Sequence, residues 1–78
     1  MLLSRGEVLA TARKLLRTFA SAPEPRRQAQ SIYSELVHGD GWTPREREAI
    51  DALGAWLQGL PRLAELKLRC EQVLTALR

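Results

Sequence analysis

The chain has 78 residues, carries 12 basic and 9 acidic side chains for a net charge of +3, and is 45% hydrophobic. This length and composition predict one globular domain over residues 1–78, and its single cysteine and single histidine exclude an intrachain disulfide and a structural zinc site. The cysteine usage favours a cytoplasmic location. The first ten residues are interrupted by Arg5, Gly6 and Glu7, so we expect neither a signal peptide nor a membrane span there.

Apolar residues recur at the spacing of one helix face in four successive segments, and no segment alternates with the period of two that a strand requires. The segments predict helices over roughly 5–20, 23–38, 44–58 and 61–77. Their apolar stripes are Val8, Leu9, Ala12, Leu15, Leu16 and Phe19; Ala29, Ile32, Tyr33, Leu36 and Val37; Ile50, Leu53, Trp56, Leu57 and Leu60; and Leu63, Leu66, Cys70, Val73, Leu74 and Leu77. The sequence therefore predicts an all-α fold, a compact bundle of four short antiparallel helices. Because Pro61 either starts the fourth helix or kinks a longer one, three helices with a long kinked C-terminal helix are the alternative.

Serine or threonine stands three residues before glutamate at three predicted helix starts, which is the spacing of a capping box. The three pairs are Ser4 with Glu7, Ser21 with Glu24, and Thr43 with Glu46. The Thr43 pair is the best placed, because Pro44 would occupy the first helical position, where no backbone N–H is needed. The Ser21 pair would put Pro25 inside the second helix, so starts at Pro23 or Pro25 remain alternatives.

The stretch from His38 to Glu48, HGDGWTPRERE, joins the second and third helices. His38 would lie at a helix C-terminus, where the helix dipole favours an imidazolium. Gly39 is expected to end the second helix in the left-handed conformation, as Gly59 is expected to end the third. Trp42 is expected to pack beneath the corner. We interpret the stretch as a junction between helices rather than a ligand-binding loop.

Two short motifs in this stretch resemble known families. The segment 43–48, TPRERE, resembles the opening of LuxR-type helix-turn-helix domains, which implies DNA reading by a later helix in the major groove. The glycine turn and later helices of that family are missing here, because Gly59 comes late, so we do not transfer the DNA-reading role. Asp40-Gly41 followed by Glu46 or Glu48 is similar to the loop and helix of TerB-like helical proteins, which implies a metal-responsive protein. The alternating oxygen ligands of a calcium loop are absent, so we expect no metal ligands.

All of the excess positive charge lies in the first half of the chain. Residues 1–38 carry six basic and three acidic side chains, whereas residues 39–78 carry six of each. The candidate residues for binding an anion or nucleic acid are Arg13, Lys14, Arg17, Arg26 and Arg27. Arg26 and Arg27 would lie in the first turn of the second helix, whose free N–H groups also attract anions. The alternative is a solvated helix surface in which Glu24 neutralises the arginine pair.

Little in the sequence suggests catalysis. Cys70 lies on the apolar stripe of the fourth helix, which favours a buried, inert thiol over a nucleophile. His38 is the only imidazole, and its place at a helix end accounts for it. No glycine-rich phosphate loop occurs. We therefore expect no catalytic residues, no metal, no cofactor and no small-molecule substrate.

Surplus apolar side chains suggest a binding surface instead. Leu68 lies about 200° from Leu66 around the fourth helix, so it falls off the predicted core face, and Ala64 lies on the same side. Leu2, Leu3 and Leu60 lie at the ends of elements, where a small bundle covers side chains poorly. Richness in Leu, Ala and Arg suggests a bacterial source. The leading hypothesis is a non-catalytic bacterial accessory, adaptor or regulatory subunit that binds a protein partner or a second copy of itself. A nucleic-acid-binding regulator is the rival hypothesis.

Overall fold

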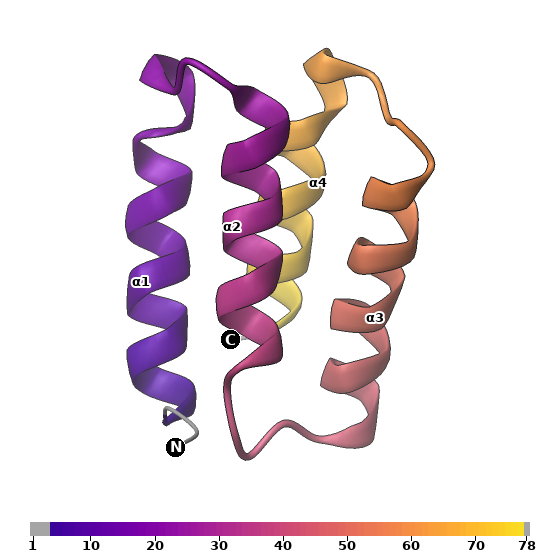
Figure 1. The fold of residues 1–78 in the computed structure, drawn as a ribbon. Helices are drawn as coiled ribbons and strands as arrows, with labels where there is room; N and C mark the ends of the chain where they lie inside the picture. Colours follow the sequence, from indigo (N-terminus) through magenta and orange to yellow (C-terminus); the bar gives the residue numbers. More distant parts are fainter. Residues whose placement is uncertain (1–3, 78) are drawn as a thin grey trace.

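Four α-helices make up the fold in the computed structural model, which describes residues 4–77 (Figure 1). They are α1 (Arg5–Arg17), α2 (Pro25–Val37), α3 (Pro44–Gln58) and α4 (Leu63–Ala76), with a short 3-10 turn, η1 (Phe19–Ser21), after α1. No β-strand occurs in this part of the chain. The predicted all-α class and the four helices are confirmed. The third and fourth helices are separate, so the alternative of a long kinked helix is wrong.

The helices run alternately up and down the bundle, so each is antiparallel to the next (Figure 1). Helices α2 and α4 each pack against all three other helices and therefore form the centre of the bundle. The start of α1 and the end of α4 lie at the same end of the bundle as the turn at residues 38–43. The turns at 18–24 and 59–62 lie at the opposite end (Figure 1).

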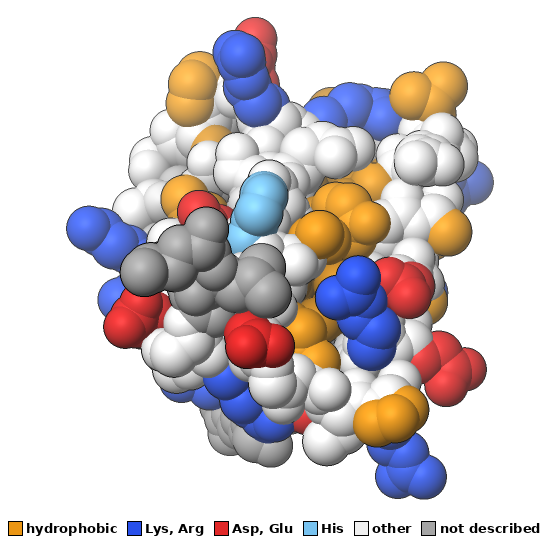
Figure 2. Space-filling model, turned by 60° about the horizontal axis from the view of Figure 1, so that its bottom comes forward, with side chains coloured by type: hydrophobic (Ala, Val, Ile, Leu, Met, Phe, Trp, Pro, Cys, Tyr) orange, Lys and Arg blue, Asp and Glu red, His pale blue; other side chains and the backbone are white. Residues whose placement is uncertain are grey.

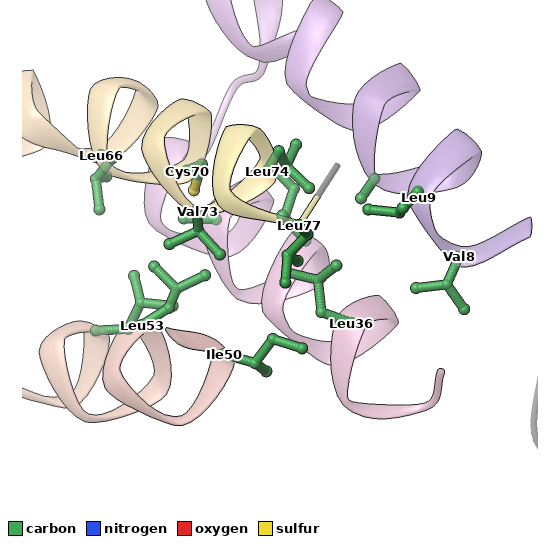
Figure 3. Close-up of a cluster of buried hydrophobic side chains, with 14 of the residues drawn as sticks. Val8, Leu9, Leu36, Ile50, Leu53, Leu66, Cys70, Val73, Leu74 and Leu77 are labelled. Atoms are coloured by element: carbon green, nitrogen blue, oxygen red, sulfur yellow. The ribbon is translucent and has the colours of Figure 1, made fainter. Parts of the chain in front are cut away.

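The core is formed by the predicted apolar stripes, which converge from all four helices (Figure 3). Its buried members are Val8, Leu9, Ala12, Phe19, Ala29, Ile32, Leu36, Ile50, Leu53, Leu57, Leu66, Cys70, Val73, Leu74 and Leu77. Two members of the predicted stripes are exposed: Leu60 by 79%, as expected from its position at the end of an element, and Leu63 by 54%. The reason is their position, because Leu60 follows the last turn of α3 and Leu63 belongs to the first turn of α4, at the end of the bundle.

The start of α3 has the strongest of the predicted caps. The Thr43 hydroxyl accepts a hydrogen bond from the Glu46 backbone N–H at 3.2 Å, and a Glu46 carboxylate oxygen accepts one from the Thr43 backbone N–H at 3.0 Å. The predicted capping box is therefore confirmed. At the start of α1, Ser4 accepts from the Glu7 N–H, with no return bond from Glu7. The Ser21 box is wrong, since α2 begins at Pro25, one of the two alternative starts.

Neither predicted glycine cap has left-handed geometry. Gly59 ends α3 with a φ of −82°, and the next residue, Leu60, has the positive φ of 56°. Gly39 follows His38, the C-cap of α2, and its φ is not positive. A Cβ at Gly39 would lie 2.8 Å from the Trp42 ring, so the absent side chain makes room for that ring. The positive φ in this turn belongs to Gly41, at 84°.

Trp42 packs beneath the corner between α2 and α3, as predicted. It is partly buried against the core, and its indole N–H donates to the Leu36 carbonyl oxygen at 2.9 Å. The guanidinium of Arg5 lies 5.4 Å from the centre of the Trp42 ring. These contacts connect the 38–43 turn to both α1 and α2.

Arg5 joins three helices at this end of the bundle. Its guanidinium forms an ion pair with Glu46 of α3, including a hydrogen bond of 2.6 Å, and donates to the Leu77 carbonyl oxygen at 2.7 Å. Leu77 is the C-cap of α4. A single side chain of α1 therefore neutralises the carboxylate that caps α3 and satisfies a carbonyl that α4 leaves free.

Candidate interaction surface

The most exposed large apolar side chains belong to the 59–62 turn and α4. They are Leu60, Leu63 and Leu68, exposed by 79%, 54% and 56%. Ala64, one turn before Leu68 on the same side of α4, is also exposed. The prediction that Ala64 and Leu68 lie outside the core is confirmed. The other two predicted contact residues, Leu2 and Leu3, lie outside the described residues.

A shallow furrow runs between α3 and α4 beside Leu68. One part of it, about 250 Å³, is lined by Trp56, Glu65, Leu68, Arg69 and Gln72. A second part, about 240 Å³, is lined by Ala49, Ala52, Leu53, Arg69, Gln72, Val73 and Ala76. Arg69 and Gln72 line both parts, so the two parts adjoin each other. We call the whole the α3–α4 furrow and its second part the alanine hollow.

The two parts of the α3–α4 furrow differ in character. The first holds the stacked pair of Arg69 and Trp56, whose guanidinium lies 5.4 Å from the ring centre, together with the carboxylate of Glu65. The alanine hollow instead has small side chains, Ala49 and Ala52, on its α3 wall and Val73 and Ala76 beside Arg69 and Gln72 on its α4 wall, and Leu53, which is 1% exposed, closes its floor. Small side chains leave room for a projecting apolar group. The α3–α4 furrow therefore offers a projecting leucine at one end and an apolar recess at the other.

The five predicted anion-binding residues are all exposed, but they do not form one cluster. The end of α1 and the start of α2 lie at the same end of the bundle (Figure 1), which places Arg17 near the level of Arg26 and Arg27. Arg13 instead borders a hollow between α1 and α4 that also contains Glu71. Arg27 is paired with Glu24 at 3.3 Å, as the alternative interpretation of this region predicted.

The 38–43 turn borders a hollow of about 510 Å³, lined by Val37, Gly39, Asp40, Gly41, Trp42 and Arg47. In Figure 2, which brings this end of the molecule forward, hydrophobic side chains lie together beside the single histidine. The polar groups at the rim already have partners. The Asp40 carboxylate accepts from the Gly41 N–H at 2.9 Å, and Arg47 lies 3.6 Å from Asp51. His38 Nδ1 lies 2.6 Å from the Ser34 carbonyl oxygen.

Glu46 is the one charged residue that the bundle buries among residues 4–77. The hydrogen bond from the Thr43 backbone N–H lowers the pKa of this carboxyl, and the Thr43 hydroxyl and Arg5 lower it further, against the opposite effect of burial. All three groups stabilise the charged form. The carboxylate therefore acts as a cap and an ion-pair partner.

The remaining candidate groups for chemistry are buried or scattered. Cys70 is fully buried on α4, as predicted, and burial raises the pKa of its thiol to about 11. A thiol with this pKa is largely protonated at neutral pH and is a poor nucleophile. Among the described residues, no three His, Cys, Asp or Glu side chains come close enough together to hold a metal ion.

Comparisons with known proteins place the chain in no family. No protein-family profile matches it, and no curated protein or solved structure is significantly similar to it. Within residues 4–77, every helix is too short or too polar to cross a bilayer.

Proposed function

We propose that the protein is a non-catalytic interaction module that binds another protein surface through the α3–α4 furrow. The exposure of Leu68 at the edge of this furrow carries the proposal. Scattered exposed leucines are ordinary, but Leu68 lies next to Trp56 and an apolar recess, and Ala64 extends the same surface. Adjoining apolar side chains of this kind mark protein contacts.

The energetics favour such a contact. Full burial of a leucine side chain is worth roughly 1.5–3 kcal/mol. Because Leu68 is 56% exposed, covering it completely would contribute about 1 kcal/mol. The walls and floor of the alanine hollow would add to this, and few polar groups there would lose water. Arg69 keeps its stacking contact with Trp56 and can stay hydrated at the rim.

Capture experiments test this function directly. The wild-type protein, Leu68→Glu and a control, Ala10→Glu, are immobilised and exposed to a lysate of the native host. Ala10 is exposed on α1, so its substitution changes the charge equally on a different surface. We expect Leu68→Glu to lose the proteins that wild type and Ala10→Glu both retain. Equal retention by all three would exclude the α3–α4 furrow as the binding surface.

A second candidate function is nucleic-acid binding through the basic residues of α1 and α2. All five are exposed. Of these five, only Arg27 has an ion-pair partner among the described residues. If they contact phosphates, Arg26→Ala combined with Arg27→Ala should reduce the slope of log affinity against log salt by roughly 2. The matched control is Arg62→Ala combined with Lys67→Ala, which removes the same charge from α4 and the turn before it. Equal slopes for both pairs would rule out a contact specific to Arg26 and Arg27.

A further inference from the structure

We infer that the partner of the α3–α4 furrow is a second copy of this chain, in a two-fold dimer in which Leu68 of each copy enters the alanine hollow of the other. The inference rests on the proposed function and names its partner. Three observations support it: the arrangement of the projection and the hollow, the distribution of charge, and the size of the molecule.

The α3–α4 furrow is complementary to itself. Leu68 lines its first part and projects into solvent, while the alanine hollow forms its second part, and Arg69 and Gln72 lie between them. When a projection and a recess lie on one face, a single two-fold axis midway between them brings each projection opposite the other copy's recess. Both contacts then form together, which is the property of an isologous interface. The axis would pass near Arg69 and Gln72, the two residues that line both parts.

The volume and chemistry of the alanine hollow suit a leucine. Its volume of about 240 Å³ exceeds that of a leucine side chain, and Ala49, Ala52 and Ala76 line it without branching. The floor is the core residue Leu53. A leucine placed there would touch apolar side chains of both α3 and α4.

Charge also favours a second copy over an acidic partner. The excess charge of +3 lies entirely in residues 1–38, whereas residues 39–78, which include α3 and α4, carry equal numbers of acidic and basic side chains. The lining of the α3–α4 furrow itself carries one acidic side chain, Glu65, and one basic side chain, Arg69, so two copies meeting there would bring together two faces without excess charge. An acidic protein would instead be attracted to the side of α1 and α2.

The molecule is large enough for such a dimer. It measures 30 × 22 × 21 Å, and a standard stable interface covers about 800 Å² on each partner. One long side of the molecule is of about this extent. The whole side formed by α3 and α4 would therefore be used, which places the exposed Ala64, beside Leu68, at the edge of the contact.

Sedimentation velocity over a range of concentrations tests the inference. We expect wild type to dimerise reversibly, and Leu68→Glu and Ala52→Gln each to raise the dissociation constant by at least about tenfold. The second change fills the alanine hollow with an uncharged side chain and leaves Leu68 in place. The control is Ala55→Gln, because Ala55 is exposed on α3 but lines neither part of the furrow. Circular dichroism of each variant confirms that it is folded.

Disulfide trapping tests the geometry. Leu68→Cys and Ala52→Cys chains are prepared separately, mixed, and oxidised with glutathione disulfide, while the buried Cys70 serves as an internal control in unaltered protein. If the two positions face each other across the axis, the linkage between residues 68 and 52 should exceed both self-linkages. A predominance of links between two Leu68→Cys chains or between two Ala52→Cys chains would overturn the arrangement.

The outcomes separate this inference from the proposed function. A wild type that stays monomeric to about 1 mM, the range of very weak association, or a dimer that Leu68→Glu and Ala52→Gln both leave unchanged, overturns the inference. If Leu68→Glu still abolishes capture of another protein in that case, the α3–α4 furrow remains a binding surface for a different partner. If Leu68→Glu changes neither self-association nor capture, both proposals are wrong.

Discussion

The two turns that flank α3 differ in how many of their side chains make contacts with the bundle. In the 38–43 turn, Trp42 donates to the carbonyl oxygen of Leu36, Thr43 caps α3, and the Glu46 carboxylate returns the cap and pairs with Arg5. In the 59–62 turn, Leu60 has a left-handed backbone and is 79% exposed. No side chain caps the start of α4 there.

This difference separates the parts of the molecule that stabilise the fold from the part available for binding. The side chains of the 38–43 turn are engaged by α1, α2 and α3, so they have few free groups to offer a partner. Leu60, Leu63 and Leu68 contribute little to the core and can change without disturbing it. A binding surface can therefore lie along α4 and the turn before it at small cost to stability.

The largest effect that would test this comparison concerns the two tryptophans, which are both partly buried. Trp42→Ala should lower the free energy of unfolding by about 2–3 kcal/mol, near the lower limit for truncation of a tryptophan because the ring is only partly covered. The loss includes the hydrogen bond to Leu36 and the stacking of Arg5. Urea unfolding followed by circular dichroism measures it.

Substitution by phenylalanine isolates the contribution of the hydrogen bond to the loss of stability. Trp42→Phe keeps an aromatic ring but leaves the Leu36 carbonyl without its donor, and should cost about 1 kcal/mol. Trp56→Phe is the matched control, because within residues 4–77 the indole of Trp56 donates no hydrogen bond. Its stability should be nearly unchanged. Equal losses at the two positions would show that the 38–43 turn has no special role.

A smaller effect of opposite sign is expected in the 59–62 turn. A left-handed conformation costs a residue with a Cβ roughly 1–2 kcal/mol. Leu60→Gly should therefore stabilise the protein, by about 1 kcal/mol after the added freedom of the unfolded chain is taken into account. Little burial is lost, because Leu60 is largely exposed.

Gly41 provides the reverse experiment in the 38–43 turn. Its φ is 84°, and a Cβ there would meet no atom within 4 Å, so Gly41→Ala tests the backbone conformation alone. It should destabilise the protein by about 1 kcal/mol. Thermal unfolding measures the change in stability of Leu60→Gly and Gly41→Ala. A loss of stability in Leu60→Gly would show that Leu60 makes apolar contacts that offset its backbone strain.

The sequence predicted the helices well because their determinants are local. A stripe with helical spacing must be buried somewhere, and one face of each helix was enough to identify the core. The Thr43 cap was predictable for the same reason, since its partner Glu46 lies three residues away. Gly59 was misassigned because either of two adjacent residues can take the left-handed conformation, and local sequence did not show that Leu60 takes it.

Contacts between distant segments were not predictable. Arg5 and Glu46 are 41 residues apart, and nothing in the spacing of either residue indicates the pair. Gly54 gave a weak signal, since glycine within a helix usually has a packing reason. A Cβ at Gly54 would lie 2.5 Å from the Tyr33 ring, so α2 and α3 approach closely there. The off-stripe position of Leu68 identified one end of the α3–α4 furrow, but the alanine hollow required the pairing of α3 with α4.

The smallest expected effect is a dependence of stability on pH through Glu46. Hydrogen bonds from the Thr43 N–H and from Arg5 lower the pKa of this carboxyl below its ordinary value of 4.5 in the folded state. The folded protein therefore binds the proton less readily than the unfolded chain does. The stabilisation is fully present above the unfolded-state pKa and is lost as the pH falls through the lowered folded-state pKa.

Glu46→Gln removes the charge while keeping the size of the side chain. We expect this variant to be less stable than wild type at pH 7, with a difference that shrinks as the pH is lowered through and below the ordinary carboxyl pKa of 4.5. Urea midpoints across this range measure the difference. Glu48→Gln is the control, because Glu48 is exposed on the same helix and has no ion-pair partner among the described residues. A difference for Glu46→Gln that stays constant with pH would mean that the capping box stabilises α3 by shape and hydrogen bonding, without a contribution from charge.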